Sequence, residues 1–453
     1  VSGAGVVTVL GGRFSGNSAA TTATGVADTF GGGGGAALRG AASLTITGTV
    51  FENNSLTGGS GGAIRVIGTG NAADLRVADA TFRNNRAGGA GISYNAGGVL
   101  EVRGSLFEAN AATNSTAGAI AAAFTGAAPG PDGLVIEGCT FRNNTAGVAG
   151  AIDNSTRLTV TDSVFAGNQA LGAQSGSFIL SGGSGAVRTS SGTQVARFVR
   201  CRFEGNTANS GAIPGNEGGA VRVRRSPAVF VDCTFTGNTA VNNRGGALWF
   251  ESLSSTLRAS TITNCTFTGN SVTGTQWLEG GAIGATGRVN LTIETSTFAE
   301  NHAPTAGSHI WGEANLDGLT LRGCTLRDAT SRSGGGVIWP GAANCTIRLE
   351  NTTFRNLAAV PNASNQGGDY GAINATGATI IVRNMLAENC SGRLHGGVRL
   401  VAGTATATVD IDGLTLRNCD AILANNTGGD YGGGEINCGA SAGGTSIIRN
   451  LLV

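Results

Sequence analysis

The chain alternates apolar and polar residues in short runs that are bounded by glycines and polar turn residues. LTITGTVF (44–51) and LTIETSTF (291–298) are examples. Alternation with a period of two is typical of strands that bury one face, and no segment shows the period of an amphipathic helix. The sequence therefore predicts a chain of short β-strands joined by tight turns.

A phenylalanine followed three residues later by an asparagine recurs along the chain and marks a repeat. Clear copies begin at Phe14, Phe51, Phe82, Phe107, Phe141, Phe165, Phe203, Phe235, Phe267 and Phe298. Weaker copies follow at Leu326, Phe354, Leu386, Ala421 and Leu452. Together they make about fifteen units of about 31 residues, a period typical of stacked repeats. The units leave no linker, so residues 1–453 are predicted to form a single β-helix domain, part of a longer or processed chain.

A second signature lies between successive phenylalanines: glycine, a small residue and an aliphatic residue. It appears as GGAI (61–64), GGAV (218–221) and GGAL (245–248). Each unit thus contains three short strands and three corners, which is what a parallel β-solenoid needs. Stacked coils would place equivalent residues about 4.8 Å apart. We expect the phenylalanines to form a core ladder and the asparagines to bond to one another at a corner.

The paired GGA-aliphatic and FxxN motifs resemble the repeats of the polymorphic outer membrane protein family. Their arrangement is similar to the right-handed parallel β-helix of the pectate-lyase-like superfamily. The resemblance implies an all-β, right-handed parallel β-helix of about fifteen coils with three short strands per coil. It also implies a secreted or surface-exposed protein of the kind that is often adhesive.

Composition narrows the possible partners. The net charge is +1 and only 13% of the residues are charged, whereas nucleic-acid binding requires a concentrated basic surface. All basic residues are arginine, which excludes any mechanism that uses a lysine. No window contains the roughly 18 continuous apolar residues of a membrane helix. We therefore expect no nucleic-acid partner and no membrane insertion.

The sequence shows no catalytic signature of polysaccharide-cutting β-helices. Such enzymes use clustered carboxylates, a basic residue and sometimes calcium. The motifs NTD, DD, GHG and RIK are absent, and His302, His309 and His395 lack metal-ligand spacing, which favours polar surface or corner positions. Asp369 and Asp430 each precede Tyr-Gly in similar loops, which could hold calcium or simply form a turn. We predict no catalytic and no metal-binding residue, with a polysaccharide lyase or glycoside hydrolase as the alternative.

Six cysteines share one position of the repeat, two residues before the phenylalanine. They are Cys139, Cys201, Cys233, Cys265, Cys324 and Cys419. Other units have serine or threonine there, so we interpret the position as a small inward-facing residue. CxxC spacing is absent, which makes a zinc site improbable.

The residue after the aliphatic of each GGA motif is expected to point outward. Three of the four tryptophans are assigned to this column. An exposed indole can stack on a sugar or anchor a protein contact, and a neighbouring arginine adds hydrogen-bond donors. A loop folded over these rings is the alternative. The predicted binding residues are Arg65, Arg188, Arg222, Trp249, Trp311 and Trp339.

Asn-x-Ser/Thr sequons are frequent, and some would be glycosylated in a eukaryotic secreted protein. The candidates are Asn53, Asn143, Asn264 and Asn351. The leading hypothesis is a non-catalytic extracellular structural or adhesive protein of a cell surface, cell wall or filament. Its expected partners are other copies of itself or other surface proteins, through its ends or lateral face, because strand edges that no helix caps invite stacking. A glycan-binding adhesin is a further alternative.

Overall fold

A computed structural model gives the fold of the chain. It describes residues 5–20, 36–39, 43–57, 61–67, 73–87, 91–112, 116–123, 133–172, 183–192, 194–209, 217–252, 256–313, 316–332, 334–360, 369–404, 407–421, 432–437 and 445–453. The chain divides into two compact units, Val1–Pro227 and Ala228–Val453. Across the described residues, no helix is long and apolar enough to span a membrane.

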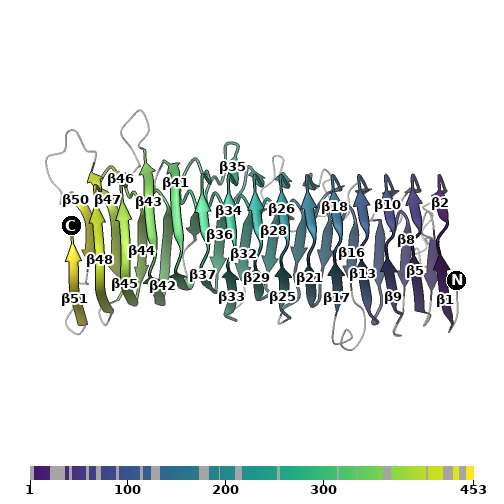
Figure 1. The fold of residues 1–453 in the computed structure, drawn as a ribbon, viewed down its shortest axis with the longest axis horizontal. Helices are drawn as coiled ribbons and strands as arrows, with labels where there is room; N and C mark the ends of the chain where they lie inside the picture. The colour runs from purple at the N-terminus through teal and green to yellow at the C-terminus, as the bar shows by residue number, and fades with distance from the viewer. Residues whose placement is uncertain are drawn as a thin grey trace, which may run out of the picture. The chain divides into compact units, whose positions relative to one another are not determined.

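Unit 1 repeats four kinds of strand in order (Figure 1). Strands that precede the phenylalanine are β1 (Val6–Leu10), β5 (Ser43–Thr47), β9 (Leu75–Ala78), β13 (Leu100–Arg103), β17 (Leu134–Glu137), β21 (Leu158–Thr161) and β25 (Ala196–Val199). Phenylalanine strands are β2 (Arg13–Ser15), β6 (Val50–Glu52), β10 (Thr81–Arg83), β14 (Leu106–Glu108), β18 (Thr140–Arg142), β22 (Val164–Ala166) and β26 (Arg202–Glu204). Short strands after the asparagine are β3 (Ser18–Ala20), β7 (Ser55–Thr57), β11 (Arg86–Ala87), β15 (Ala111–Ala112), β19 (Thr145–Ala146), β23 (Gln169–Ala170) and β27 (Thr207–Asn209). GGA strands are β4 (Ala36–Arg39), β8 (Ile64–Ile67), β12 (Ile92–Asn95), β16 (Ile120–Ala123), β20 (Ile152–Asn154), β24 (Val187–Thr189) and β28 (Val221–Arg224).

Unit 2 follows the same order, with some strands fused. Strands that precede the phenylalanine are β29 (Ala228–Val231), β33 (Arg258–Thr263), β37 (Val289–Glu294), β40 (Leu316–Arg322), β42 (Val337–Glu350), β45 (Thr379–Glu388), β48 (Thr408–Arg417) and β51 (Thr445–Leu452). Separate strands at the phenylalanine position are β30 (Thr234–Thr236), β34 (Thr266–Thr268), β38 (Thr297–Ala299), β41 (Thr325–Ser331) and β43 (Thr353–Ala359). Short strands after the asparagine position are β31 (Thr239–Val241), β35 (Ser271–Thr273), β46 (Ser391–Gly392) and β49 (Asp420–Ala421). GGA strands are β32 (Leu248–Ser252), β36 (Ile283–Gly287), β39 (Ile310–Gly312), β44 (Ile373–Gly377), β47 (His395–Ala402) and β50 (Gly432–Asn437), and β42 begins as one.

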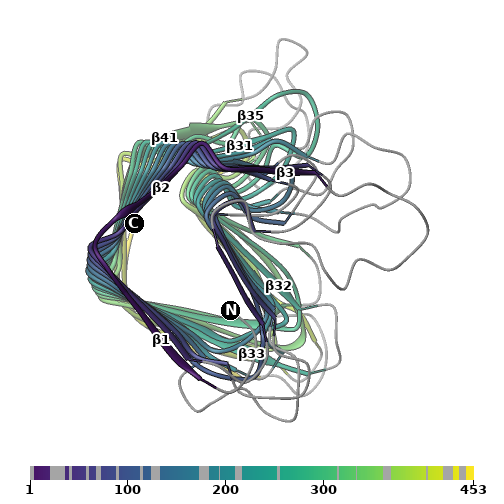
Figure 2. The same cartoon turned by 90° about the vertical axis from the view of Figure 1, so that its right-hand side faces the viewer.

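Equivalent strands pair in parallel and in register. In unit 1, Phe82 aligns with Phe107 and Phe107 with Phe141. Their buried rings stack with centroids 4.5 and 4.9 Å apart, so the predicted core ladder is confirmed. Figure 2 shows, within each unit, successive coils following the same walls around a common interior. Counted over the described residues, unit 1 has seven and unit 2 eight strands of the kind that precedes the phenylalanine, in agreement with about fifteen predicted coils.

The asparagines form the predicted ladder at a corner. Asn85 is buried, and its Nδ2 donates to Asn110 Oδ1 at 2.9 Å and to the carbonyl oxygen of Phe51 at 2.9 Å. The backbone N–H of Asn85 also donates to Asn110 Oδ1 at 3.1 Å. The side chains therefore satisfy buried backbone groups that the turn leaves without a strand partner.

The position two residues before the phenylalanine faces inward, as predicted. Ser163 Oγ donates to the carbonyl oxygen of Thr161 at 2.8 Å and accepts from the backbone N–H of Cys139 at 3.1 Å. Cys139 occupies the same position one coil earlier and is also buried. The residue just before it takes a left-handed conformation, with φ of 60° at Gly138 and 52° at Asp162. These residues make the bend that the odd step in the apolar pattern predicted.

Close packing between coils explains why the GGA motif contains glycine. A Cβ on Gly150 would lie 2.1 Å from the carbonyl oxygen of Gly185, and one on Gly185 would lie 1.9 Å from that of Gly219. Since real Cβ atoms do not approach an oxygen so closely, the coils can stack at this corner only if the residue has no side chain.

The alignment of the last units was wrong, by one residue at Leu386 and Leu452 and by five residues at Ala421. Phe354 pairs with Ala387, and Ala387 pairs with Leu416. Leu386 and Leu452 therefore lie beside the ladder and not in it, because β45 and β48 continue without the separate phenylalanine strand that marks earlier coils. Neither the phenylalanine nor the asparagine is present there to fix the register from sequence.

Candidate functional site

The outward column of unit 1 has the predicted register from Arg65 to Arg222, but Arg222 is buried, which corrects its expected exposure. Arg65 aligns with Ser93, and the column continues through Ala121, Asp153, Arg188 and Arg222 on β8, β12, β16, β20, β24 and β28. The parallel register brings residues from coils far apart in sequence onto one face. Arg65, Arg188 and Arg222 therefore share this column.

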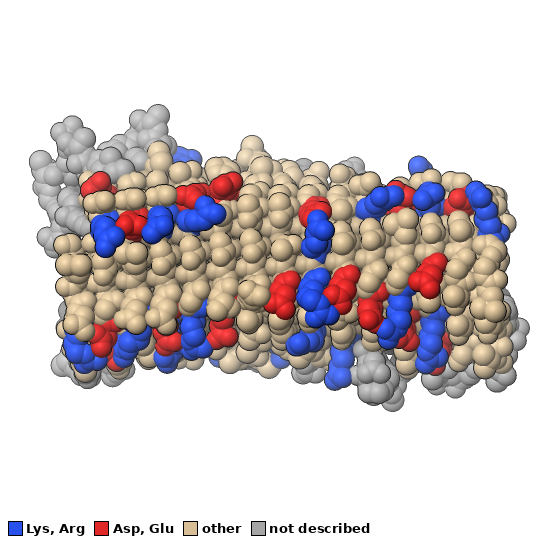
Figure 3. Space-filling view, in the orientation of Figure 1, with Lys and Arg blue, Asp and Glu red and all other residues tan. Residues whose placement is uncertain are grey.

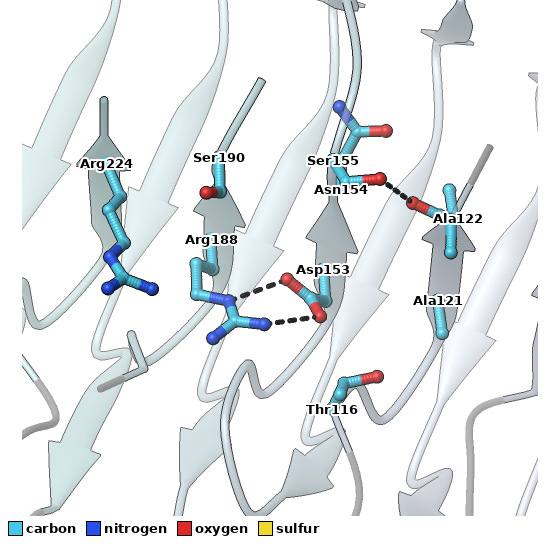
Figure 4. A pocket seen from close by; sticks show the side chains of 10 residues that line it. Thr116, Ala121, Ala122, Asp153, Asn154, Ser155, Arg188, Ser190 and Arg224 are labelled. Atoms are coloured by element: carbon cyan, nitrogen blue, oxygen red, sulfur yellow. Dashed lines mark hydrogen bonds and ion pairs between the residues drawn. The ribbon is translucent and has the colours of Figure 1, made fainter. Parts of the chain in front are cut away.

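A groove of about 370 Å³ lies along this column. Ala121, Ala122 and Ala123 of β16 leave space beside the larger side chains of the next coils. The other lining residues are Thr116, Asp153, Asn154, Ser155, Arg188, Ser190 and Arg224 (Figure 4). Small side chains on one strand thus produce the hollow, and polar side chains surround it.

Asp153 and Arg188, two of the charged residues that line the groove, form an ion pair. Arg188 Nε donates to Asp153 Oδ1 at 2.7 Å and Arg188 Nη2 to Asp153 Oδ2 at 2.8 Å, a bidentate pair seen in Figure 4. Their side chains are 14% and 15% exposed. Arg222, 6% exposed, pairs with Glu217 at 3.0 Å. Because a bidentate pair fixes both partners, Asp153 and Arg188 neutralise each other in the groove.

The same matching extends along the corners of each unit. Arg200 pairs with Asp162 at 2.6 Å in unit 1, and Arg322 pairs with Glu350 at 2.8 Å in unit 2. Figure 3 shows basic and acidic side chains alternating in rows. Exposed pairs of this kind contribute little stability each.

The outward column of unit 2 differs from the prediction. Trp249 aligns with Gly284, Gly284 with Trp311, and Trp311 with Ile338. Trp339 instead points inward and is fully buried, so its assignment to the column was wrong. Val337, and not Ile338, is the aliphatic of the motif there, which shifts the alternation by one residue.

The expected exposure of Trp249 was also wrong. Trp249 belongs to the column but is only 1% exposed. A Cβ on Gly284 would lie 2.5 Å from Trp249 Cε3 and Cζ3, so the indole lies against that glycine. Trp311 remains half-buried, with its ring stacked on Trp249 at a centroid separation of 6.4 Å. Its binding role stays a prediction.

The fourth tryptophan, which the column analysis missed, completes an aromatic group. Trp277 is 46% exposed, and its ring centroid lies 4.3 Å from the guanidinium carbon of Arg244. The same carbon lies 4.6 Å from the Trp311 centroid and 5.9 Å from the Trp249 centroid. We call Arg244, Trp249, Trp277 and Trp311 the tryptophan cluster. Only the presence of a tryptophan in the turn before a GGA motif could have suggested it from sequence.

Two carboxylates fix the arginine of the tryptophan cluster. Arg244 Nε donates to Glu279 Oε2 at 3.1 Å, and Arg244 Nη1 lies 3.5 Å from Glu313 Oε2. Thr286 Oγ1 donates to the same Glu313 oxygen at 2.6 Å. The Arg244 side chain is 11% exposed, whereas that of Glu313 is 43% exposed. A partly buried cation thus contacts the aromatic rings while one carboxylate faces solvent.

The four candidate glycosylation residues share one geometry. Asn53, Asn143, Asn264 and Asn351 are all exposed. Each takes a left-handed conformation, with φ between 49° and 55°. Such turns present the side chain outward at a corner, where a glycan would have room. Their glycosylation stays a prediction.

The proposed calcium loops receive no support from geometry. Arg393 Nε donates to Asp369 Oδ1 at 2.7 Å, so this carboxylate already has a cationic partner. Asp430 lies outside the described residues. Within the described ranges, no group of three or more His, Cys, Asp or Glu side chains could hold a metal ion. Calcium binding remains untested.

His309 and His395 are buried, which corrects their expected surface or corner positions. The side chain of His309 follows the asparagine ladder of unit 2, where Asn301 Nδ2 lies 3.1 Å from His309 Nδ1. Full burial lowers the pKa of His309 to about 3, since desolvation disfavours the charged ring. This ring is neutral at physiological pH and caps the ladder.

The cysteines act mainly as small core residues. Cys139, Cys201, Cys233 and Cys265 are buried, as the interchange with serine predicted. Burial raises the pKa of Cys139 to about 12. Cys419 was assigned wrongly to the position two residues before the phenylalanine, because it aligns with Cys390 and Leu357, three residues after the phenylalanine position. It is half-buried, and a hydrogen bond with the Cys390 thiol lowers its pKa to about 7.

The parallel ladders and the inward phenylalanines define a right-handed parallel β-helix. Residues 130–298 and 186–330 match the family model described as a right handed beta helix region. A solved structure, that of the PL6 family alginate lyase AlyGC, is similar over 99% of this chain and 97% of that chain, with 10% identity and a TM-score of 0.23. No curated protein matches the sequence.

Proposed function

We propose that the protein is a non-catalytic, extracellular structural or adhesive β-helix of a cell surface, cell wall or filament. The observation that carries this proposal is the bidentate Asp153–Arg188 pair in the groove. Glycoside hydrolysis requires two carboxyl groups, one of which exchanges a proton with the leaving group. Asp153 is the one acidic residue that lines the groove, and Arg188 holds both of its oxygens. The groove therefore suits binding better than proton transfer.

The geometry of the sequons supports an extracellular location. Asn143 and Asn264 are exposed at left-handed corners, where an attached glycan would not disturb the ladders. The proposed partners are other copies of the chain, other surface or wall proteins, and glycans. The lateral face supports such contacts because paired charges such as Asp153 and Arg188 can be desolvated together.

The test is an assay for polysaccharide turnover. Purified protein is incubated with uronic-acid and neutral polysaccharides, with and without calcium, and reducing ends and unsaturated products are measured. We expect no turnover with any substrate. Turnover that disappears in Asp153→Asn, but persists in the matched variant Asp162→Asn, would overturn the proposal. Asp162 is a suitable control because it makes the same type of pair with Arg200 outside the groove.

Binding is measured in parallel. Sedimentation with insoluble polysaccharide particles reports attachment to a surface, and analytical ultracentrifugation at rising concentration reports self-association. We expect at least one of these two contacts. A protein that neither attaches nor associates would contradict the structural and adhesive proposal.

A further inference from the structure

We propose that the tryptophan cluster of unit 2 binds a neutral glycan, with Trp277 as the stacking platform and Glu313 as the hydrogen-bond acceptor. The inference rests on the proposed binding function and names its ligand class and its site. It differs from the sequence prediction, which placed the tryptophan contacts on Trp249, Trp311 and Trp339.

Trp277 is partly exposed to solvent although a guanidinium lies over its ring. The guanidinium of Arg244 lies over the ring at 4.3 Å from its centroid, yet Trp277 is still 46% exposed. Glu279 and Glu313 hold the guanidinium, so the ring rests on a fixed support. A rigid, partly exposed indole is suited to the apolar C–H face of a sugar ring, because it loses little conformational freedom on binding.

The backbone at Trp277 supports a functional role. Its φ is 57°, in the left-handed region, which is unfavourable for a bulky side chain. The surrounding turn is anchored, since Thr275 N–H donates to Asn242 Oδ1 at 2.9 Å and Thr305 N–H donates to the carbonyl oxygen of Leu278 at 3.0 Å. A glycine would fit this turn without strain. Strain held in place by its surroundings is typical of binding sites.

Polar groups lie beside the ring. The Glu313 side chain is 43% exposed, and both its bond from Thr286 and its contact with Arg244 involve Oε2. A carboxylate held in this way can accept a strong hydrogen bond from a sugar hydroxyl. Trp311 is half-buried and lies next to Arg244, which adds a second apolar surface. Convergent apolar and polar groups of this kind are what a sugar ring requires.

The local charge selects the ligand class. Arg244 carries one positive charge, whereas Glu279 and Glu313 carry two negative charges. A uronate would bring its carboxylate toward this excess of negative charge, and the only guanidinium of the tryptophan cluster is already engaged. A neutral sugar avoids that repulsion. The charge balance therefore favours neutral glycans over acidic ones.

The test measures oligosaccharide affinity by titration calorimetry. The neutral probes are cellohexaose, mannohexaose and laminarihexaose, and the acidic probes are hexagalacturonate and hexamannuronate. We expect at least one neutral probe to bind more tightly than both acidic probes. Trp277→Ala should weaken that binding at least tenfold, and Glu313→Gln should weaken it severalfold. Trp339→Phe, which changes a buried tryptophan of the same unit, should bind as the unaltered protein does.

Fluorescence quenching gives a second measurement, which uses the unaltered protein and does not depend on how well a variant folds. Acrylamide quenches the fluorescence of exposed tryptophan, and the bound neutral probe should reduce this quenching in the unaltered protein. Equal affinity in Trp277→Ala, tighter binding of the acidic probes, or no binding of any probe would overturn the inference. These outcomes leave the non-catalytic proposal intact, whereas turnover of a probe would overturn that proposal instead.

Discussion

The asparagine ladder allows a quantitative test of what holds the coils together. Asn144 is fully buried in unit 1, and its Oδ1 accepts from Asn110 Nδ2 at 2.9 Å and from the backbone N–H of Asn110 at 3.1 Å. Its Nδ2 donates to the carbonyl oxygen of Phe107 and to Asn168 Oδ1, each at 3.0 Å. Asn144→Ala removes all four bonds at once.

The cost follows from the groups that lose a partner. The backbone N–H of Asn110 is left unsatisfied inside the protein, which costs about 1–3 kcal/mol. One N–H of the Asn110 side chain and the carbonyl oxygen of Phe107 each lose a bond worth about 1 kcal/mol. Asn168 Oδ1 keeps the backbone N–H of residue 144, so it adds little. The expected loss in the free energy of unfolding is about 3–5 kcal/mol.

Urea unfolding, followed by both circular dichroism and fluorescence, measures this loss. The matched control is Asn17→Ala, which removes an equivalent bond to Asn54 at the exposed end of the same ladder. Water can replace the bond there, so we expect a loss below about 1 kcal/mol. Hydrogen exchange should show faster opening at Asn110 in Asn144→Ala alone. Equal losses in the two variants would refute the argument that burial gives the ladder its strength.

Three further predictions concern glycine, histidine and cysteine. Gly185→Ala should lower the free energy of unfolding by about 3 kcal/mol or more, because its Cβ would overlap a carbonyl oxygen. Gly205 has open space around it but a φ of 58°, so Gly205→Ala should lower the free energy of unfolding by only about 1 kcal/mol. Urea unfolding measures both losses. His309 has a pKa of about 3 in the folded protein and a reference pKa of 6.5. The unfolded chain therefore binds a proton below pH 6.5 that the folded protein does not, so the free energy of unfolding should be full above pH 6.5 and fall by about 3 kcal/mol by pH 4. The fall should be smaller in His309→Leu. Among the described cysteines, Cys419 should react fastest with iodoacetamide at neutral pH, at a rate that rises through about pH 7. Cys390→Ala should slow this reaction because it removes the hydrogen bond that lowers the Cys419 pKa, and peptide mapping would show the sites.

The repeat made much of the fold predictable. Phenylalanine and asparagine recur at the positions of Phe107 and Asn144 because each coil packs against equivalent residues of the next coil. One repeat unit therefore specifies both ladders. The predicted position or exposure of a side chain was wrong where it depends on features that the repeat does not specify. Trp339 was misplaced because one extra aliphatic residue changed the apparent alternation. Trp249 is buried because Gly284, one coil away, makes room for its ring.

The tryptophan cluster was beyond sequence reasoning for a related reason. Arg244, Trp277 and Glu313 come from three different coils, and no local pattern joins them. These residues come into contact only in the folded protein, where the turns that carry Arg244 and Trp277 lie next to the GGA strands of neighbouring coils. A pattern read along the chain identifies what each coil repeats, whereas a site of this kind is built from differences between coils.

Ligand specificity can therefore vary in this fold without loss of the ladders. Inward positions such as Phe107 and Asn144 contact two neighbouring coils, so a change there costs stability in three coils at once. Outward positions such as Arg65, Ser93 and Ala121 occupy one column with quite different side chains. Surface substitutions usually change stability by less than about 0.5 kcal/mol. The outward face and its turns are thus the part of the molecule where a binding surface can be altered independently of the fold.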